Sequence, residues 1–321
     1  MVKTYIIGAG ALGTALAQNI SKNLKEVYLY ARRKEVSDDI NNNSQNKDYF
    51  PNVPLNSNII GINDLNELKN ADCVILTIPS SSLEKIIKTI APKIKSDCII
   101  ISTIKGINKK TSEPASEIIK KYCQNPLAVL SGPNIANEIV LDMPAASTIA
   151  INSNEYKDMI LNIFQSDKFK VQFSDDLIGT ELCGILKNIL AISFGICEGL
   201  KINDSAKFAV LNKGFVEARK MIKEFGGKQS TILNYCGFGD MVTASTLPVS
   251  RNHTLGVLYG QKIIIDENAT GVVFEGKNSI ITVKRLCDEK NINSSIVEFV
   301  NDVIIKKDNP ESAFKNLWQT I

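Results

Sequence analysis

The sequence is poor in the residues that build metal centres and disulfides. His253 is the only histidine among 321 residues, and the seven scattered cysteines form no CxxC pair. A single imidazole excludes metal sites that need several, and it leaves proton chemistry to Lys, Asp, Glu or Tyr. The odd number of cysteines is typical of reduced thiols that fill a core. No apolar run reaches the roughly 18 residues that a membrane span needs, and no signal peptide is visible, so a cytoplasmic protein is expected.

A large excess of one charge is also lacking. The net charge is +3, from 37 basic and 34 acidic residues, which is too small to indicate a nucleic-acid partner. Hydrophobic residues make up 44% of the chain and charged residues 22%, which excludes disorder as the dominant state. The length favours about two domains.

Continuous apolar strands alternate with amphipathic helices in the first half of the chain. The expected strands are 2–7, 26–30, 72–79, 97–103, 127–130 and 145–151, and the expected helices include 11–20 and 80–94. This pattern predicts an α/β domain with a doubly wound, mostly parallel sheet. The Asn-rich stretch 41–58 is expected to be a long surface loop.

Helical stretches dominate after about residue 175. They are expected at 176–200, 204–226, 229–235, 252–260, 268–271, 277–290 and 294–306. The sequence therefore predicts a dinucleotide-binding domain over 1–179 and a mainly helical substrate domain over 180–321.

A glycine-rich motif lies between the first expected strand and the first expected helix. Residues 8–13 read GAGALG, which fits the GxGxxG fingerprint of a dinucleotide site. Gly8 permits a tight turn, Gly10 lets the backbone approach a pyrophosphate, and Gly13 allows close packing of helix on sheet. The helix N-terminus adds N–H groups and the positive end of a dipole. With its strand, helix and βαβ continuation, the motif predicts a Rossmann-type cofactor domain.

The acid that usually binds the ribose at the end of the second strand is missing. The strand ending at Tyr30 runs instead into Ala31, Arg32 and Arg33. Two guanidinium groups can clamp a 2′-phosphate or stack on adenine, although both can also be solvated loop residues. The sequence therefore favours NADPH and leaves NADH open.

Lys187 interrupts an otherwise apolar helix, 182–196. Burying a lysine is costly unless it faces a cavity or a carboxylate, and burial lowers its pKa in a way that suits proton transfer. The residue alone is compatible with a functional role and with a paired or snorkelling structural one. Other segments with more polar groups than packing needs are 131–138, 237–240, 250–252 and 274–276.

Together these segments resemble the bacterial NAD(P)-dependent glycerol-3-phosphate dehydrogenase family. The family's patterns match at 8–17 (GAGxxGTALA), 105–106 (KG), 131–138 (SGPxxAxE), 187–192 (KNxxAI), 237–242 (GxGDxV), 250–252 (SRN) and 273–276 (VxEG). The matches keep their order and span nearly the whole chain. The resemblance implies an oxidoreductase that interconverts dihydroxyacetone phosphate and sn-glycerol 3-phosphate with NADPH or NADH.

The resemblance also implies roles for single residues. Lys187 would accept the proton of the C2 hydroxyl, Lys105 would support charge on the oxygen, and Asp240 would hold the lysine and a substrate hydroxyl in place. The substrate would be lined by Lys105, Gly132, Asn134, Lys187, Asp240, Ser250, Arg251 and Asn252, with Arg251 on its phosphate. The cofactor would be contacted by Gly8, Gly10, Ala11, Leu12, Gly13, Arg32, Arg33, Tyr49, Lys105, Ala136, Arg251, Val273 and Glu275.

Some positions depart from the family's pattern. Asn134 stands where Ser or Thr is usual, and Ala244 replaces a frequent Thr. If that threonine touches the phosphate, Ser245 or Thr246 must compensate, or affinity is lower. His253 is compatible with a role in phosphate binding and with a place on the surface.

Two other functions stay open. A hydroxyacid or ketopantoate reductase also carries a lysine on a helix, but it would leave SGPxxAxE and SRN unexplained. A non-catalytic redox sensor would bind the dinucleotide without needing Lys105, Lys187 or Asp240.

The resemblance further implies a role in glycerophospholipid metabolism, with a small-molecule substrate and no nucleic acid or membrane span. A homodimer is compatible with the sequence but not required by it.

Overall fold

The computed structural model describes residues 2–265 and 274–321 and divides into two compact units. The first comprises Met1–Ile104 and Ala115–Thr180, and the second comprises Lys105–Pro114 and Glu181–Ile321. The sequence placed a single boundary between 179 and 180, whereas the short segment 105–114 belongs with the second unit. The division at 180 falls inside helix α7 (Leu177–Gly199).

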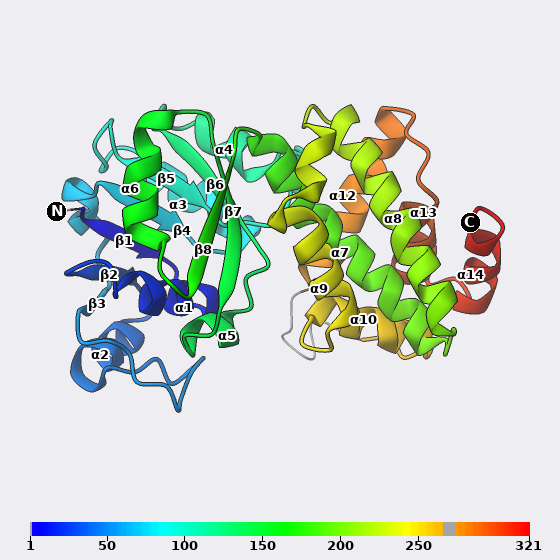
Figure 1. Cartoon of the computed structure of the whole chain (residues 1–321), viewed down its shortest axis with the longest axis horizontal. Helices are drawn as coiled ribbons and strands as arrows, with labels where there is room; N and C mark the ends of the chain where they lie inside the picture. Colours follow the sequence, from blue (N-terminus) through cyan, green and yellow to red (C-terminus); the bar gives the residue numbers. More distant parts are fainter. Residues whose placement is uncertain (1, 266–273) are drawn as a thin grey trace. The chain divides into compact units, whose positions relative to one another are not determined.

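The first unit contains one eight-stranded sheet (Figure 1), in the order β3-β2-β1-β4-β5-β6-β7-β8. The strands are β1 (Thr4–Ile7), β2 (Val27–Tyr30), β3 (Ile59–Ile62), β4 (Cys73–Leu76), β5 (Ile99–Ser102), β6 (Leu127–Ser131), β7 (Ala145–Ile151) and β8 (Phe169–Ser174). All neighbouring pairs are parallel except β6 and β7. This confirms the predicted mostly parallel sheet. The strand order reverses at β1, which is where such sheets bind ligands.

Strand β4 is apolar throughout because helices cover both faces of the sheet. Cys73 and Ile75 belong to one buried cluster, Val74 and Leu76 belong to the other, and all four are fully buried. Side chains alternate across a strand, so a strand covered on both faces needs a continuous apolar run. Burying one such side chain contributes about 1.5–3 kcal/mol to stability relative to exposure.

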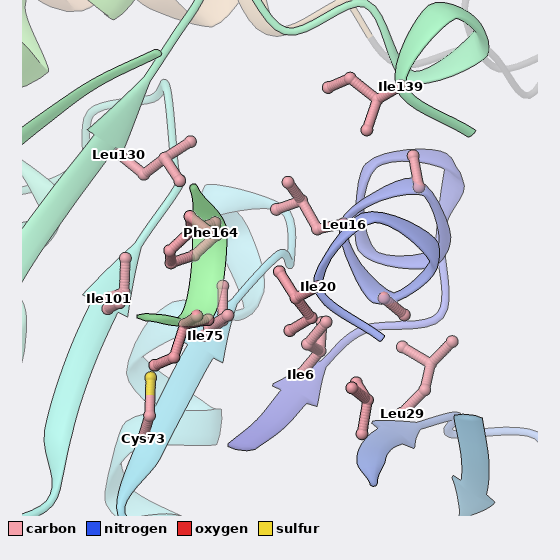
Figure 2. Close-up of a cluster of buried hydrophobic side chains, with 14 of the residues drawn as sticks. Ile6, Leu16, Ile20, Leu29, Cys73, Ile75, Ile101, Leu130, Ile139 and Phe164 are labelled. Atoms are coloured by element: carbon pink, nitrogen blue, oxygen red, sulfur yellow. The ribbon is translucent and has the colours of Figure 1, made fainter. Parts of the chain in front are cut away.

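Helix α1 (Ala11–Ile20) lies on one face of this sheet. Figure 2 shows Leu16 and Ile20 of α1 turned toward Ile6 of β1 and toward Phe164. All four side chains are fully buried. This packing fixes the N-terminus of α1 at the carboxyl end of β1, which is where the glycine motif lies.

Several elements of the first unit were not expected from the sequence. The stretch 41–58 begins in α2 and ends just before β3, so only 44–58 lacks a helix or named strand. Strands β3 and β8 were also missed. The helices of this unit are α1, α2 (Lys34–Asn43), η1 (Leu65–Asn70), η2 (Ser80–Ser82), α3 (Leu83–Ile90), α4 (Ala115–Lys120), α5 (Ala136–Val140), η3 (Asn154–Tyr156) and α6 (Lys157–Phe164).

The second unit is helical, as expected (Figure 1). After α7 it contains α8 (Asp204–Glu224), η4 (Gln229–Leu233), η5 (Tyr235–Gly239), α9 (Asp240–Thr246), α10 (Arg251–Gly260), α12 (Glu275–Glu289), α13 (Ser295–Asn301), η6 (Asp302–Lys306) and α14 (Pro310–Trp318). The expected helix at 268–271 lies outside the described residues. Helix α7 is long and apolar enough to cross a membrane, but 89% of its apolar window is buried, as in the core helix of a globular unit.

The backbones of α7 and α10 approach each other closely in the second unit. A Cβ on Gly195 of α7 would lie 2.2 Å from the carbonyl oxygen of His253, and a Cβ on Gly256 of α10 would lie 2.2 Å from that of Ile192. Only glycine permits this approach. It holds the first turn of α10, which carries the SRN segment, against α7, which carries Lys187.

Candidate functional site

Of the three glycines in the turn after β1, only Gly10 has open space beside its backbone. Gly8 has φ +119° and donates from its N–H to the Tyr30 carbonyl oxygen at 3.1 Å. A Cβ on Gly13 would lie 1.9 Å from the Gly8 carbonyl oxygen, whereas a Cβ on Gly10 would meet nothing within 4 Å. Gly8 and Gly13 are therefore needed by the fold itself, and the backbone at Gly10 is accessible to a ligand.

The N-terminus of α1 lies at this open position. Gly10 is its N-cap and provides no side-chain hydrogen bond, and the first turn contains no acidic residue. Ala11 and Leu12 are half-buried. Uncapped N–H groups at the positive end of a helix dipole favour an anion, so these residues fit the pyrophosphate of a dinucleotide.

Two residues that the sequence analysis missed support this turn. The Asn46 side chain is buried and donates from Nδ2 to the Ala9 carbonyl oxygen at 3.0 Å and to Thr14 Oγ1 at 2.8 Å. Thr77 Oγ1 donates to the Gly8 carbonyl oxygen at 2.9 Å. Nothing in the sequence distinguishes Asn46 from the other asparagines of the polar stretch in which it lies.

The expected cofactor residues after β2 are exposed. Arg33 forms an ion pair with Asp48, and Tyr49 beside it is 49% exposed. The Arg32 guanidinium has no partner among residues 2–265 and 274–321. The structure therefore places both arginines and Tyr49 in the unit that carries the glycine turn, and of the two guanidinium groups only that of Arg33 has a partner within the described ranges.

The segment after β6 contains buried polar atoms without partners. Asn134 Nδ2 donates to Ser147 Oγ, but Asn134 Oδ1 and the Oγ of Ser131, the last residue of β6, are buried and have no partner among the described residues. Gly132 is buried, and Ala136 begins α5. A buried polar atom without a partner carries a desolvation cost that a ligand can remove, so Asn134 is suited to accept a hydrogen bond from a substrate hydroxyl.

Two lysines share one carboxylate in the second unit. Lys187 Nζ lies 2.7 Å from Asp240 Oδ1, and Lys105 Nζ lies 2.8 Å from Asp240 Oδ2. The Asp240 side chain is only 4% exposed, while those of the lysines are 14% and 15% exposed. The three expected catalytic residues therefore meet in one largely buried cluster.

The cluster shifts the pKa values of its members in opposite directions. Burial, together with the nearby Lys105 ammonium, lowers the pKa of Lys187 from 10.5 to about 8, although Asp240 opposes this shift. Burial alone would raise the pKa of Asp240, but the two ammonium groups outweigh it and lower that pKa to about 2. The cluster thus carries a permanent carboxylate and a lysine that can exchange a proton near neutral pH.

Each member of the cluster is held by a different element. Lys187 lies on α7, and Asp240 is the first residue of α9, directly after η5. Lys105 begins the segment 105–114, and its carbonyl oxygen accepts a hydrogen bond from Asn188 Nδ2 at 3.3 Å. Asn188 was noted in the sequence only as the neighbour of Lys187, and the structure shows that it joins the two lysine-bearing segments.

The SRN segment is tied to the same helix. Asn252 Nδ2 donates to Asn188 Oδ1 at 2.9 Å, and Asn252 Oδ1 accepts from the Gly276 N–H at 3.2 Å. Ser250 caps α10, because its Oγ accepts from the His253 N–H at 3.3 Å. Arg251 is exposed and has no partner in the described part of the chain. Its guanidinium is therefore available to an anion.

The remaining residues that the sequence analysis considered, Val273 aside, lie in α9, in α10 and at the start of α12. Glu275 is half-buried in the first turn of α12, and Val273 lies outside the described residues. His253 is buried, with Nε2 3.3 Å from Glu198 Oε2, so the alternative of a surface histidine is wrong. Thr246 donates its hydroxyl to the Val242 carbonyl oxygen at 2.9 Å. The other possible replacement for a hydroxyl at Ala244, Ser245 Oγ, is buried and has no partner among the described residues.

A dinucleotide turn on a doubly wound sheet and a lysine held by a buried carboxylate define an NAD(P)-dependent oxidoreductase. Two family models, described as the N-terminus and the C-terminus of NAD-dependent glycerol-3-phosphate dehydrogenase, match residues 3–157 and 176–315. The chain belongs to the NAD(P)-dependent glycerol-3-phosphate dehydrogenase family.

Relatives along the full length agree with this assignment. The chain is 33% identical over 320 residues to glycerol-3-phosphate dehydrogenase [NAD(P)+] of Clostridium botulinum, covering 99% of this chain and 97% of that protein. The crystal structure of glycerol-3-phosphate dehydrogenase from Coxiella burnetii matches with a TM-score of 0.91 and 30% identity, covering 99% and 98% of the two chains.

The ketopantoate reductase alternative is similar to this chain in fold only. A ketopantoate reductase from Ralstonia eutropha covers 98% of this chain and all of its own, but with a TM-score of 0.65 and 14% identity. The resemblance seen in the motifs is therefore confirmed at the level of the family.

Proposed function

We propose that the protein interconverts dihydroxyacetone phosphate and sn-glycerol 3-phosphate with NADPH or NADH. The observation that carries this proposal is the Lys105–Asp240–Lys187 cluster, since a carbonyl reduction needs a proton donor and positive charge at the developing alkoxide. A bound nicotinamide dinucleotide would supply the hydride.

Lys187 is the group that we propose to exchange the proton. In the reducing direction its ammonium gives a proton to the substrate oxygen as the carbonyl becomes a hydroxyl, and in the oxidising direction the neutral amine takes that proton back. Its pKa of about 8 permits both states near neutral pH. Asp240 holds the amine in place, and Lys105 adds positive charge beside the same carboxylate.

Arg251 is the group that we propose to bind the substrate phosphate. It is the first residue of α10, where the positive end of the helix dipole also favours an anion, and the Ser250 cap uses only the His253 N–H. Its guanidinium can hold two phosphate oxygens at once. Asn252, through Asn188, keeps this helix end attached to the lysine helix.

The glycine turn is the part of the first unit that we propose to hold the cofactor. Gly10, Ala11 and Leu12 present the N–H groups at the start of α1 to the pyrophosphate, and Arg32 lies after β2 with a guanidinium that has no partner in the described part of the chain. A supply of glycerol 3-phosphate to phospholipid synthesis follows from the family resemblance and stays a prediction. Cytoplasmic location is a prediction from the sequence, with which a homodimer is compatible.

The test is the oxidation of NADPH and of NADH, followed by absorbance, with and without dihydroxyacetone phosphate. We expect oxidation only when the substrate is present, and none with ketopantoate in its place. A protein that binds the dinucleotide but oxidises it with neither compound would favour the redox sensor and contradict the proposal.

A further inference from the structure

The arginines that follow β2 differ in what surrounds them. Arg33, the N-cap of α2, is ion-paired with Asp48, whereas Arg32 has no partner among the described residues. The side chains of Arg33 and Asp48 are 59% and 42% exposed, so their pair contributes little to folding stability. A ligand phosphate can therefore compete with Asp48 for Arg33.

Asp48 is held close to the dinucleotide turn by its own segment. Two residues before it, Asn46 is buried and hydrogen-bonded to the Ala9 carbonyl oxygen and to Thr14. The N–H groups of Tyr49 and Phe50 donate to the Asn46 carbonyl oxygen at 3.2 and 2.9 Å. This turn fixes the backbone on either side of Asp48, so the carboxylate belongs to a segment that is anchored to the glycine motif and pairs with Arg33 after β2.

Asp39, another acid of this region, is already paired with other residues. Asp39 pairs with Lys47 at 3.1 Å and accepts from Asn43 at 2.7 Å. The end of β2 itself carries no acid, although this is where dinucleotide sites commonly place one against the ribose hydroxyls. Asp48 brings a carboxylate to the region from the following loop instead.

We propose that Asp48 is a specificity-determining residue for the cofactor. By holding Arg33, it lowers the preference of the site for a dinucleotide that carries a 2′-phosphate, and it keeps NADH competitive with NADPH. The 2′-phosphate of NADPH must displace the Asp48 carboxylate before it can bind the Arg33 guanidinium. NADH has a ribose hydroxyl at that position and can bind without displacing Asp48. This inference rests on the proposed function, because it concerns the same dinucleotide site.

The test measures dissociation constants of NADPH and NADH by fluorescence titration of the full-length protein, without substrate and at low ionic strength. Asp48→Asn keeps the shape of the side chain and removes its charge. We expect the ratio of the NADH to the NADPH dissociation constant to rise by roughly threefold to tenfold. Glu117→Gln, which neutralises a lysine-paired carboxylate on α4, is the matched control and should leave the ratio unchanged.

A second pair of variants tests whether Asp48 acts through Arg33. In an Arg33→Gln background, the Asp48→Asn change should lose most of its effect on the ratio. An unchanged ratio in Asp48→Asn, or an effect of the same size without Arg33, would overturn the proposal. If the wild-type protein binds both dinucleotides but reduces no dihydroxyacetone phosphate, the proposed function fails while the inference stands. If it binds neither dinucleotide, both fail.

Discussion

Asn252 donates a 2.9 Å hydrogen bond from Nδ2 to Oδ1 of Asn188. Asn188 in turn donates to the Lys105 carbonyl oxygen, and Asn252 accepts from the Gly276 N–H. The amides thus connect four separate segments of the second unit, among them both lysine-bearing ones. Asn252 is therefore a positioning residue for the Lys105–Asp240–Lys187 cluster. One N–H of its Nδ2 is donated to Asn188, and the other can be donated to a substrate.

Removing the Lys187 amine should lower turnover more than it changes binding of the cofactor. We expect Lys187→Ala to reduce the turnover of dihydroxyacetone phosphate by about 10²–10⁴-fold, which is the usual contribution of a positioned acid or base. The affinity for NADPH, measured by fluorescence titration, should stay near that of the wild type, since the glycine turn is in the other unit.

Lys220→Ala is the control for this change. Lys220 is an exposed residue of α8 in the same unit, and its removal should leave turnover unaltered. A Lys187→Ala protein with near-normal turnover would show that another group transfers the proton.

The pH dependence should follow the pKa of Lys187, which is about 8. Reduction needs the ammonium form, so its kcat/KM should fall as the pH rises through about 8, while oxidation needs the amine and should rise over the same range. Burial is the main cause of the lowered pKa, and the Lys105 charge adds to it. Lys105→Gln should therefore move the midpoint to higher pH, besides lowering the rate. A midpoint that does not move would mean that the profile reports a different group.

Asp240 should matter for folding as well as for catalysis. Asp240→Asn leaves two poorly exposed ammonium groups without a counter-charge, and removing one partner of a buried ion pair costs about 3–5 kcal/mol. Urea unfolding at pH 7 measures this loss. The wild-type contribution should be present above about pH 3.8 and disappear as the pH falls toward 2, because the folded state lowers the pKa of this carboxyl.

Asp302→Asn provides the comparison. Asp302 pairs with Lys306 within one turn near the surface, and neutralising it should leave the free energy of unfolding almost unchanged. If both variants lost the same free energy of unfolding, the buried ion pairs of Asp240 would contribute no more to stability than a surface pair.

The sequence predicts elements best where local pattern and packing agree. The bounds of α1 and β7 follow from the small-residue face after the glycine motif and from the apolar run 145–151, and both are confirmed. The antiparallel direction of β7 is set by pairing with β6, which no local pattern encodes. Strand β8 is missing from the expected strands although Lys170 and Gln172 alternate with apolar residues, which is the pattern of a strand covered on one face.

The site residues likewise divide into those that a sequence motif indicates and those that only tertiary contacts bring to the site. The family resemblance pointed to Lys105, Lys187 and Asp240, but their convergence depends on a segment, 105–114, that leaves the first unit and joins the second. Asn46 and Asp48 lie in a stretch whose composition indicates only a loop. Their hydrogen bond and ion pair to residues more than a dozen positions away are tertiary contacts, so sequence pattern gave no sign of them.

Phosphate recognition should depend on Arg251. Its exposed guanidinium, at the N-terminus of α10, is suited to hold two phosphate oxygens, and a reductase for a carboxylate substrate would arrange this group differently. The wild-type protein should therefore reduce dihydroxyacetone phosphate well and dihydroxyacetone hardly at all. Truncating one partner of a desolvated charge pair costs about 2–5 kcal/mol, so Arg251→Ala should remove most of that discrimination in kcat/KM.

Arg219→Ala, which removes an exposed arginine of α8, should leave the discrimination between the two substrates intact. Some loss of NADPH affinity in Arg251→Ala is compatible with the prediction, because the same side chain is expected to contact the cofactor. Measuring kcat/KM for both substrates separates the two effects, since a weaker cofactor site lowers both values together and a lost phosphate contact lowers only one. Equal activity of the wild-type protein on the phosphorylated and unphosphorylated substrate would contradict the role of Arg251, because no phosphate contact would then be used.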